Sequence, residues 1–110
     1  MSSTDVNAGV MSRLEQVIQD RLNDAQYSKS YVASLAAKGT DAILKKIGEE
    51  ATETVMAAKD GDSEKIIYET ADLCFHTMIM LAHYNVSVEQ VLEELDRRMG
   101  VSGLAEKAAR

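Results

Sequence analysis

The chain contains no proline and no tryptophan, and aromatic residues make up only 5% of its 110 residues. Its long stretches are rich in Ala, Leu, Glu, Lys and Met, which favour helix over sheet. No apolar run approaches the roughly 20 residues that a membrane-spanning helix needs, and the N-terminus lacks the basic start and apolar segment of a signal peptide. We therefore predict a cytoplasmic, all-α protein with no membrane partner, built as a flexible N-terminus over residues 1–10 and one domain over residues 11–110.

Cysteine and positive charge are also scarce. The single Cys74 excludes an internal disulfide, suits a reducing compartment and is expected to be a small buried hydrophobe. The net charge is −6, from 18 acidic and 12 basic residues. Removing five clustered carboxylates leaves 13 acids against 12 bases, so the acidity is concentrated at one place and nothing resembles the basic stripe of a nucleic-acid-binding protein.

Apolar residues recur at helical spacing and predict helices over about residues 11–25, 30–39, 40–60, 63–84 and 87–99. Expected N-terminal caps are Ser30, Thr40 or Asp41, Ser63, and Ser87. The helix over residues 63–84 is apolar nearly all round between Cys74 and Ala82. Such a helix must be buried on several sides, so we expect a homodimer formed through this half of it.

The most informative pattern is a pair of short carboxylate clusters. They comprise Glu49, Glu50, Glu53, Glu69 and Asp72. Gly61 lies eight residues from Glu53 and eight from Glu69, so a hairpin folded there brings the clusters to one height, roughly 12 Å from the turn. Each like-charged contact at about 4 Å costs on the order of 4 kcal/mol at an effective dielectric of 20. The cluster must therefore bind cations, take up protons or splay apart, and oxygen-only ligands favour Mg²⁺, Mn²⁺ or Ca²⁺.

The carboxylates and the residues beside them each have two possible roles. The carboxylates themselves fit the solvated face of two amphipathic helices as well as a metal site. Lys45 and Lys46 either meet substrate phosphates or form ordinary helix ion pairs with the glutamates. His76 borders the same face, where a hydrogen-bonded structural histidine is favoured over a ligand or general base, and His83 is expected at the surface.

Mg²⁺ is usually shared between a few carboxylates and substrate phosphates, so hydrolysis of a phosphoanhydride is the chemistry that fits. The sequence has no Gly-rich phosphate loop, zinc-ligand spacing or Ser/His/Asp signature. Neither histidine follows a glutamate by three residues, which excludes the Glu-x-x-His pattern of di-iron carboxylate bundles.

The Glu-Glu-x-x-Glu and Glu-x-x-Asp motifs resemble those of the MazG-like all-α NTP pyrophosphohydrolase superfamily. More specific segments resemble its phosphoribosyl-ATP pyrophosphohydrolase family over about residues 12–110. They are Ser30-Tyr31-Val32, Lys46-Ile47-Gly48-Glu49-Glu50, Ala57-Ala58-Lys59-Asp60-Gly61-Asp62, Ala71-Asp72-Leu73 with His76, and the tail from Gly100-Val101-Ser102-Gly103 to Arg110. The resemblance implies a four-to-five-helix bundle with a central hairpin. It also implies Mg²⁺-dependent hydrolysis of phosphoribosyl-ATP, a step of histidine biosynthesis, to phosphoribosyl-AMP and pyrophosphate, with Mn²⁺ as the alternative ion.

The resemblance also implies roles for residues of this chain. The metal ligands are expected to be Glu50, Glu53, Glu69 and Asp72. Glu49 is the catalytic candidate, which either orients or deprotonates the attacking water or joins the metal ligands. Cations that offset the substrate's charge are expected to be Lys45, Lys46, Lys107 and Arg110. Two other functions compete with this one: a house-cleaning nucleoside triphosphate pyrophosphohydrolase, and a non-catalytic helical dimer that binds metal or a partner.

Overall fold

The computed structural model describes residues 9–100, which form five α-helices and one short 3₁₀ helix, with no strand in that range. The elements are α2 (Val10–Asn23), η1 (Ala25–Tyr27), α3 (Tyr31–Ala37), α4 (Thr40–Asp60), α5 (Ser63–His83) and α6 (Val88–Met99). The predicted all-α fold is confirmed. Of the expected flexible segment 1–10, residues 1–8 lie outside the described part of the chain.

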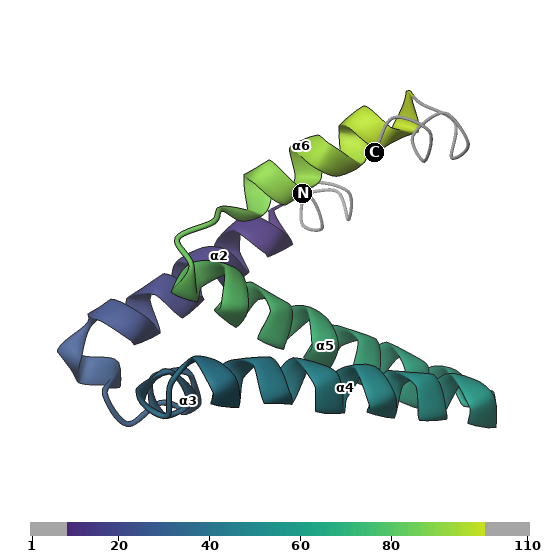
Figure 1. Ribbon diagram of the computed structural model, residues 1–110, viewed down its shortest axis with the longest axis horizontal. Helices are drawn as coiled ribbons and strands as arrows, with labels where there is room; N and C mark the ends of the chain where they lie inside the picture. Colours follow the sequence, from purple (N-terminus) through teal and green to yellow (C-terminus); the bar gives the residue numbers. More distant parts are fainter. Residues whose placement is uncertain (1–8, 101–110) are drawn as a thin grey trace.

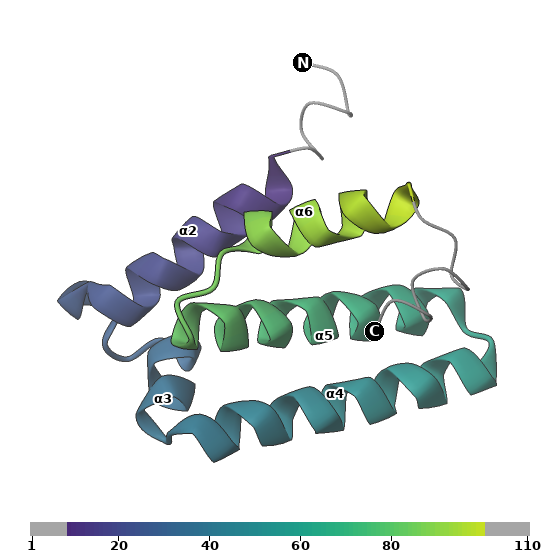
Figure 2. The same ribbon diagram turned by 45° about the horizontal axis from the view of Figure 1, so that its top comes forward.

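The central feature is the antiparallel hairpin of α4 and α5, which pack against each other from the turn and diverge toward their other ends (Figures 1 and 2). Gly61 makes the turn in the left-handed conformation, with φ of 68° and its N–H bonded to the Ala58 carbonyl oxygen at 3.1 Å. The cap of α5 is Asp62, whose carboxylate accepts from the N–H groups of Glu64 and Lys65. The prediction of Ser63 was wrong because that residue already has helical backbone geometry, whereas Asp62 is extended.

Among the other predicted N-terminal caps, those of α3 and α6 are confirmed and that of α4 is wrong. Ser30 caps α3, and Ser87 forms the expected capping box with Gln90 at the start of α6. The N-cap of α4 is Gly39, with φ of 99° and no side-chain cap, rather than Thr40 or Asp41. Only glycine adopts that φ readily, so the chain turns at Gly39 and the helix begins at the next residue.

The core lies where α2, α3 and the outer end of the hairpin meet, away from Gly61. Its buried side chains are Ile18, Val32, Leu35, Ile43, Met78, Ile79, Ala82 and Val88. Full burial of one such large aliphatic side chain contributes about 1.5–3 kcal/mol. Figure 1 shows α2 and α6 rising at an angle from the hairpin beside this core. The two buried polar side chains within residues 9–100, Glu50 and His76, both belong to the hairpin.

An apolar groove runs between α5 and α6. Its lining includes Leu73, Cys74 and Leu81 of α5 and Leu92 and Leu95 of α6, and its volume is about 290 Å³. Cys74 is exposed there, so the expectation of a buried cysteine was wrong: the side chains of residues 9–100 that line the groove leave it open to solvent. Across residues 9–100, no helix is both long enough and apolar enough to cross a membrane.

Candidate metal centre

Four of the predicted carboxylates converge midway along the hairpin. Glu50 and Glu53 project from α4, and Glu69 and Asp72 from α5. Each offers one oxygen to a group in which all four atoms lie within 4.8 Å of one another. The turn at Gly61 brings the two pairs to the same height, so the like charges face each other instead of splaying apart.

Two oxygen atoms in this cluster are buried and have no hydrogen-bond partner. They are Oε2 of Glu50 and Oε2 of Glu69, and the whole Glu50 side chain is only 3% exposed. A buried carboxylate oxygen without a partner carries a desolvation cost that a bound cation can offset. The donor set therefore fits a hard divalent cation, whose preferred ligands are carboxylate oxygens.

The ionisation of the cluster shows the same crowding. The neighbouring carboxylates of Glu69 and Glu50 raise the pKa of Glu53, and burial together with Glu50 raises the pKa of Asp72. Burial would also raise the pKa of Glu50, but its bonds with Asp72 and Lys46 outweigh burial and lower it. Without a cation, Glu53 and Asp72 therefore keep their protons to a higher pH than isolated carboxyl groups do.

Thr54 ties the two ligand-bearing helices together at this height. Its hydroxyl lies 2.8 Å from the Glu50 carbonyl oxygen on its own helix and 3.2 Å from the Glu69 carbonyl oxygen on α5. One donor is therefore shared between the main chains of two predicted ligands. The sequence did not single out Thr54, although a threonine four residues after Glu50 on the hairpin face was a usable signal.

Lys46 and Lys45 both contact the glutamates on α4, but unequally. Nζ of Lys46 lies 3.1 Å from Oε1 of buried Glu50, a bond that raises the pKa of Lys46, and 3.7 Å from Glu49. Nζ of Lys45 is 3.9 Å from Glu49, and its side chain is 78% exposed. Glu49 does not join the four converging carboxylates; its 45% exposed side chain faces the two lysines beside them.

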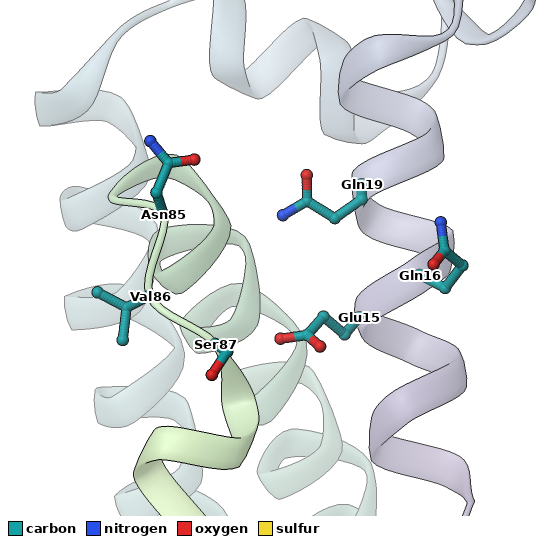
Figure 3. Close-up of a pocket in the computed structure, with 6 residues that line it drawn as sticks. All are labelled: Glu15, Gln16, Gln19, Asn85, Val86 and Ser87. Carbon is teal, nitrogen blue, oxygen red and sulfur yellow. The ribbon is translucent and has the colours of Figure 1, made fainter.

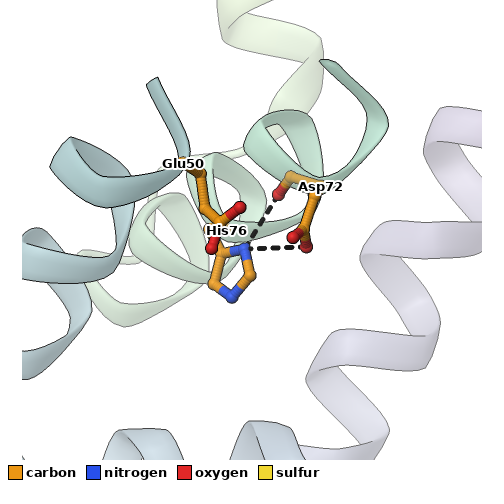
Figure 4. A group of neighbouring side chains, drawn as sticks. All are labelled: Glu50, Asp72 and His76. Carbon is orange, nitrogen blue, oxygen red and sulfur yellow. Dashed lines mark hydrogen bonds and ion pairs between the residues drawn. The ribbon is translucent and has the colours of Figure 1, made fainter. Parts of the chain in front are cut away.

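His76 is buried against the cluster and hydrogen-bonded at both ring nitrogens. Nδ1 lies 2.8 Å from the Asp72 carbonyl oxygen and 3.3 Å from Asp72 Oδ1 (Figure 4). Nε2 lies 2.8 Å from the hydroxyl of Tyr31 in α3. This is the hydrogen-bonded structural histidine that the sequence favoured. The role of Tyr31 was missed, because no local pattern signals a contact across 45 residues.

The remaining predicted residues lie elsewhere. Lys107 and Arg110 fall outside the described residues. His83 is exposed, as expected, and its Nε2 lies 2.9 Å from the Thr40 hydroxyl.

A separate polar pocket lies between α2 and the loop that leads into α6. Its lining comprises Glu15, Gln16, Gln19, Asn85, Val86 and Ser87 (Figure 3). Oε2 of Glu15 accepts the Val88 N–H at 2.7 Å, which joins α2 to the positive end of α6. This carboxylate already has a main-chain partner, and we assign it a structural role.

Comparison with known proteins points to one family. A family model described as phosphoribosyl-ATP pyrophosphohydrolase matches residues 11–99. A phosphoribosyl-ATP pyrophosphatase from Bordetella avium is 58% identical over 105 residues, covering 94% of this chain and 90% of the relative. One from Methylococcus capsulatus is 57% identical over 101 residues, covering 92% and 95%, and one from Neisseria gonorrhoeae is 56% identical over 101 residues, covering 92% and 94%.

Proposed function

Because the chain belongs to the phosphoribosyl-ATP pyrophosphohydrolase family and hydrolyses phosphoribosyl-ATP in histidine biosynthesis, we propose that the converging carboxylates are its active site. Water would cleave the bond between the α and β phosphates and give phosphoribosyl-AMP and pyrophosphate. Glu50, Glu53, Glu69 and Asp72 would hold Mg²⁺, for which Mn²⁺ can substitute. The observation that carries this proposal is the pair of buried, unpartnered oxygens on Glu50 and Glu69 within the cluster.

When bound, a divalent cation supplies polarisation of the phosphate oxygens and neutralises part of their charge. The chain's own residues supply the rest. We assign Glu49 to orienting the attacking water and accepting its proton, because this carboxylate is solvent-accessible and borders the cluster without joining it. We assign Lys46, with Lys45, to attracting the polyanionic substrate, since their ammonium groups lie 3.7 and 3.9 Å from Glu49 beside the cluster.

Pyrophosphate release, measured with and without Mg²⁺, tests the reaction. Phosphoribosyl-ATP should be hydrolysed far faster than ATP or deoxynucleoside triphosphates, and only with the metal. Comparable turnover of ordinary triphosphates would indicate a house-cleaning enzyme instead. Calorimetric titration with Mg²⁺ in the absence of substrate tests the metal site separately, because Glu53→Gln should weaken this binding whatever the substrate.

The two lysines provide a matched pair for substrate binding. Lys46→Ala should raise KM for phosphoribosyl-ATP more than Lys45→Ala does, because the Lys46 ammonium lies 3.1 Å from Glu50 of the cluster, whereas the Lys45 side chain is 78% exposed and lies 3.9 Å from Glu49. An unchanged KM in Lys46→Ala would leave Lys46 with only its helix ion pairs.

We also propose that two chains associate through the groove between α5 and α6. Val91, Leu92 and Leu95 are 40–48% exposed there, although they form the apolar stripe of an amphipathic helix. Light scattering should give twice the 12.0 kDa mass of one chain. A well-folded species near 12.0 kDa would reject the dimer. We place the enzyme in the cytoplasm, where a free thiol such as Cys74 stays reduced.

A further inference from the structure

We propose that the absence of a side chain at Gly48 lets the uncharged nucleoside part of the substrate lie against the backbone of α4, beside the carboxylate cluster. This inference rests on the proposed function in requiring that phosphoribosyl-ATP reacts at the cluster. It adds which part of the nucleotide lies where, and it makes Gly48 a specificity-determining residue.

Gly48 lies at a position where glycine weakens the fold. Of the glycines among residues 9–100 it alone lies inside a helix, whereas Gly39 and Gly61 make turns with positive φ. A glycine in a helix interior destabilises the folded state relative to alanine, because it loses more conformational freedom on folding. Packing within the chain does not explain it. Among the described residues, a Cβ placed on Gly48 would meet no atom within 4 Å outside the adjoining turns of α4.

The space over Gly48 is an open pocket of about 480 Å³, a volume in the usual range for small-molecule sites. Its other lining residues are Lys45, Glu49, Thr52 and Glu53. Glu53 is one of the four converging carboxylates, and Glu49 lies beside them. The pocket therefore adjoins the place where the phosphates would react, and the room left by Gly48 is room for a group attached to them.

The charges and hydrogen bonds of this pocket suit an uncharged group better than a phosphate. Its lining carries two carboxylates against one ammonium, that of Lys45, which lies 3.9 Å from Glu49. The Thr52 hydroxyl already donates to the Gly48 carbonyl oxygen at 3.0 Å, and N–H groups inside a helix donate to the helix itself. Ribose hydroxyls, in contrast, can donate to carboxylates, and a flat base can lie on a backbone that has no Cβ. We therefore place the base and ribose next to the α-phosphate over Gly48.

The test adds side chains of increasing size at position 48. Alanine and glutamine both favour helix over glycine, so the melting temperature of metal-free Gly48→Ala and Gly48→Gln should rise by a few degrees. Calorimetric titration without substrate should give an unchanged Mg²⁺ affinity in both. The two reaction products then serve as probes, each as an inhibitor of phosphoribosyl-ATP hydrolysis with Mg²⁺ present.

Only ligands that contain the nucleoside should lose affinity. In Gly48→Gln, the KM of phosphoribosyl-ATP and the inhibition constant of phosphoribosyl-AMP should rise by about tenfold or more, the scale of overfilling a packed site. Gly48→Ala should show a smaller rise, and the inhibition constant of pyrophosphate should stay unchanged in both variants. Ala58→Gln is the matched control, because it adds the same side chain at an exposed position of α4 outside the pocket and should change none of these constants.

An unchanged inhibition constant for phosphoribosyl-AMP in Gly48→Gln overturns the inference. An equal loss of pyrophosphate affinity overturns it as well, because it would place phosphate over Gly48. Equal losses in the alanine and glutamine variants would assign Gly48 to helix flexibility, and a wild-type dimer that dissociates in Gly48→Gln, detected by light scattering, would assign it to contact with a second chain. Absence of Mg²⁺ binding and of Mg²⁺-dependent turnover in the wild type would instead overturn the proposed active site, and this inference with it.

Discussion

Two regions of the molecule differ in how their carboxylates are paired with positive charge. On α6 the single carboxylate of Glu94 has two arginine partners, with Arg97 Nη2 at 2.7 Å and Arg98 Nε at 3.2 Å. In the hairpin four carboxylates converge, and Lys46 is the lysine that reaches them, at Glu50. The first region supplies its own counter-charges from the next turn of the helix. The second leaves negative charge that a cation from solution can match.

The same difference appears in the direction of the pKa shifts. The bonds to Arg97 and Arg98 lower the pKa of Glu94 from 4.5 to about 2, so its stabilisation is present above pH 4.5 and lost as the pH falls toward about 2. Glu53 and Asp72 have raised pKa values, so any stabilisation they contribute is present at low pH and lost as the pH rises through those values. As the pH of a metal-free solution rises, the ion pairs of Glu94 should therefore increase the free energy of unfolding, whereas the hairpin carboxylates should decrease it.

The largest effect is expected from Asp72→Asn, which keeps the shape of the side chain but removes one negative ligand. Metal-free Asp72→Asn should be no less stable than wild type at neutral pH, with a flatter loss of stability as the pH rises. The roughly 2.7 kcal/mol that a ligand at one hundred times its dissociation constant adds to the folded state should be mostly lost. Pyrophosphate release should largely disappear. Melting curves and turnover with and without Mg²⁺ measure all of these.

A purely structural role for Asp72 makes the reverse prediction. The metal-free variant would be destabilised, and hydrolysis would persist once the protein had folded. Near-normal turnover of Asp72→Asn would end the assignment of this carboxylate as a ligand.

An intermediate effect is expected at Thr54, where valine replaces the hydroxyl with a methyl group of similar size. Thr54→Val should lower the free energy of unfolding by about 1 kcal/mol and weaken Mg²⁺ binding by about tenfold, because the link between Glu50 and Glu69 is lost. Thr52→Val is the control: the Thr52 hydroxyl is exposed and bonds the Gly48 carbonyl oxygen within α4. Equal changes in metal affinity in the two variants would remove Thr54 from the site.

The smallest effect is expected from Glu94→Gln, because the ion pairs it breaks are half-exposed and screened by solvent. Mg²⁺ binding and turnover should stay at wild-type values. Only the loss of stability below pH 4.5 should become shallower, and the difference should shrink as salt is added. Acid titrations followed by circular dichroism at low and high salt would detect it, and a change in Mg²⁺ affinity would show that the two regions are coupled.

The features that could be predicted from the sequence are those that depend on the spacing of residues along one helix or across one turn. The hairpin and the meeting of its carboxylates follow from the equal distances of Glu53 and Glu69 from Gly61. The cap of α5 was misplaced by one residue, because Asp62 and Ser63 are both good capping residues and backbone geometry decides between them. Tyr31 could not be predicted, because its partner is brought to it only by the packing of α3 against the hairpin.

The two ends of the hairpin differ in how many of their side chains are buried. Beyond the carboxylates, between residues 54 and 68, Ala57 is the single buried side chain, and Val55, Met56, Ile67 and Tyr68 are 61–70% exposed. If α4 and α5 separate locally from the Gly61 end, almost no buried apolar contact opposes this until the separation reaches the acidic side chains. A cation held between the helices would act there as a clasp, so the rate at which amide hydrogens of this segment exchange with solvent becomes a gauge of how much metal the protein carries.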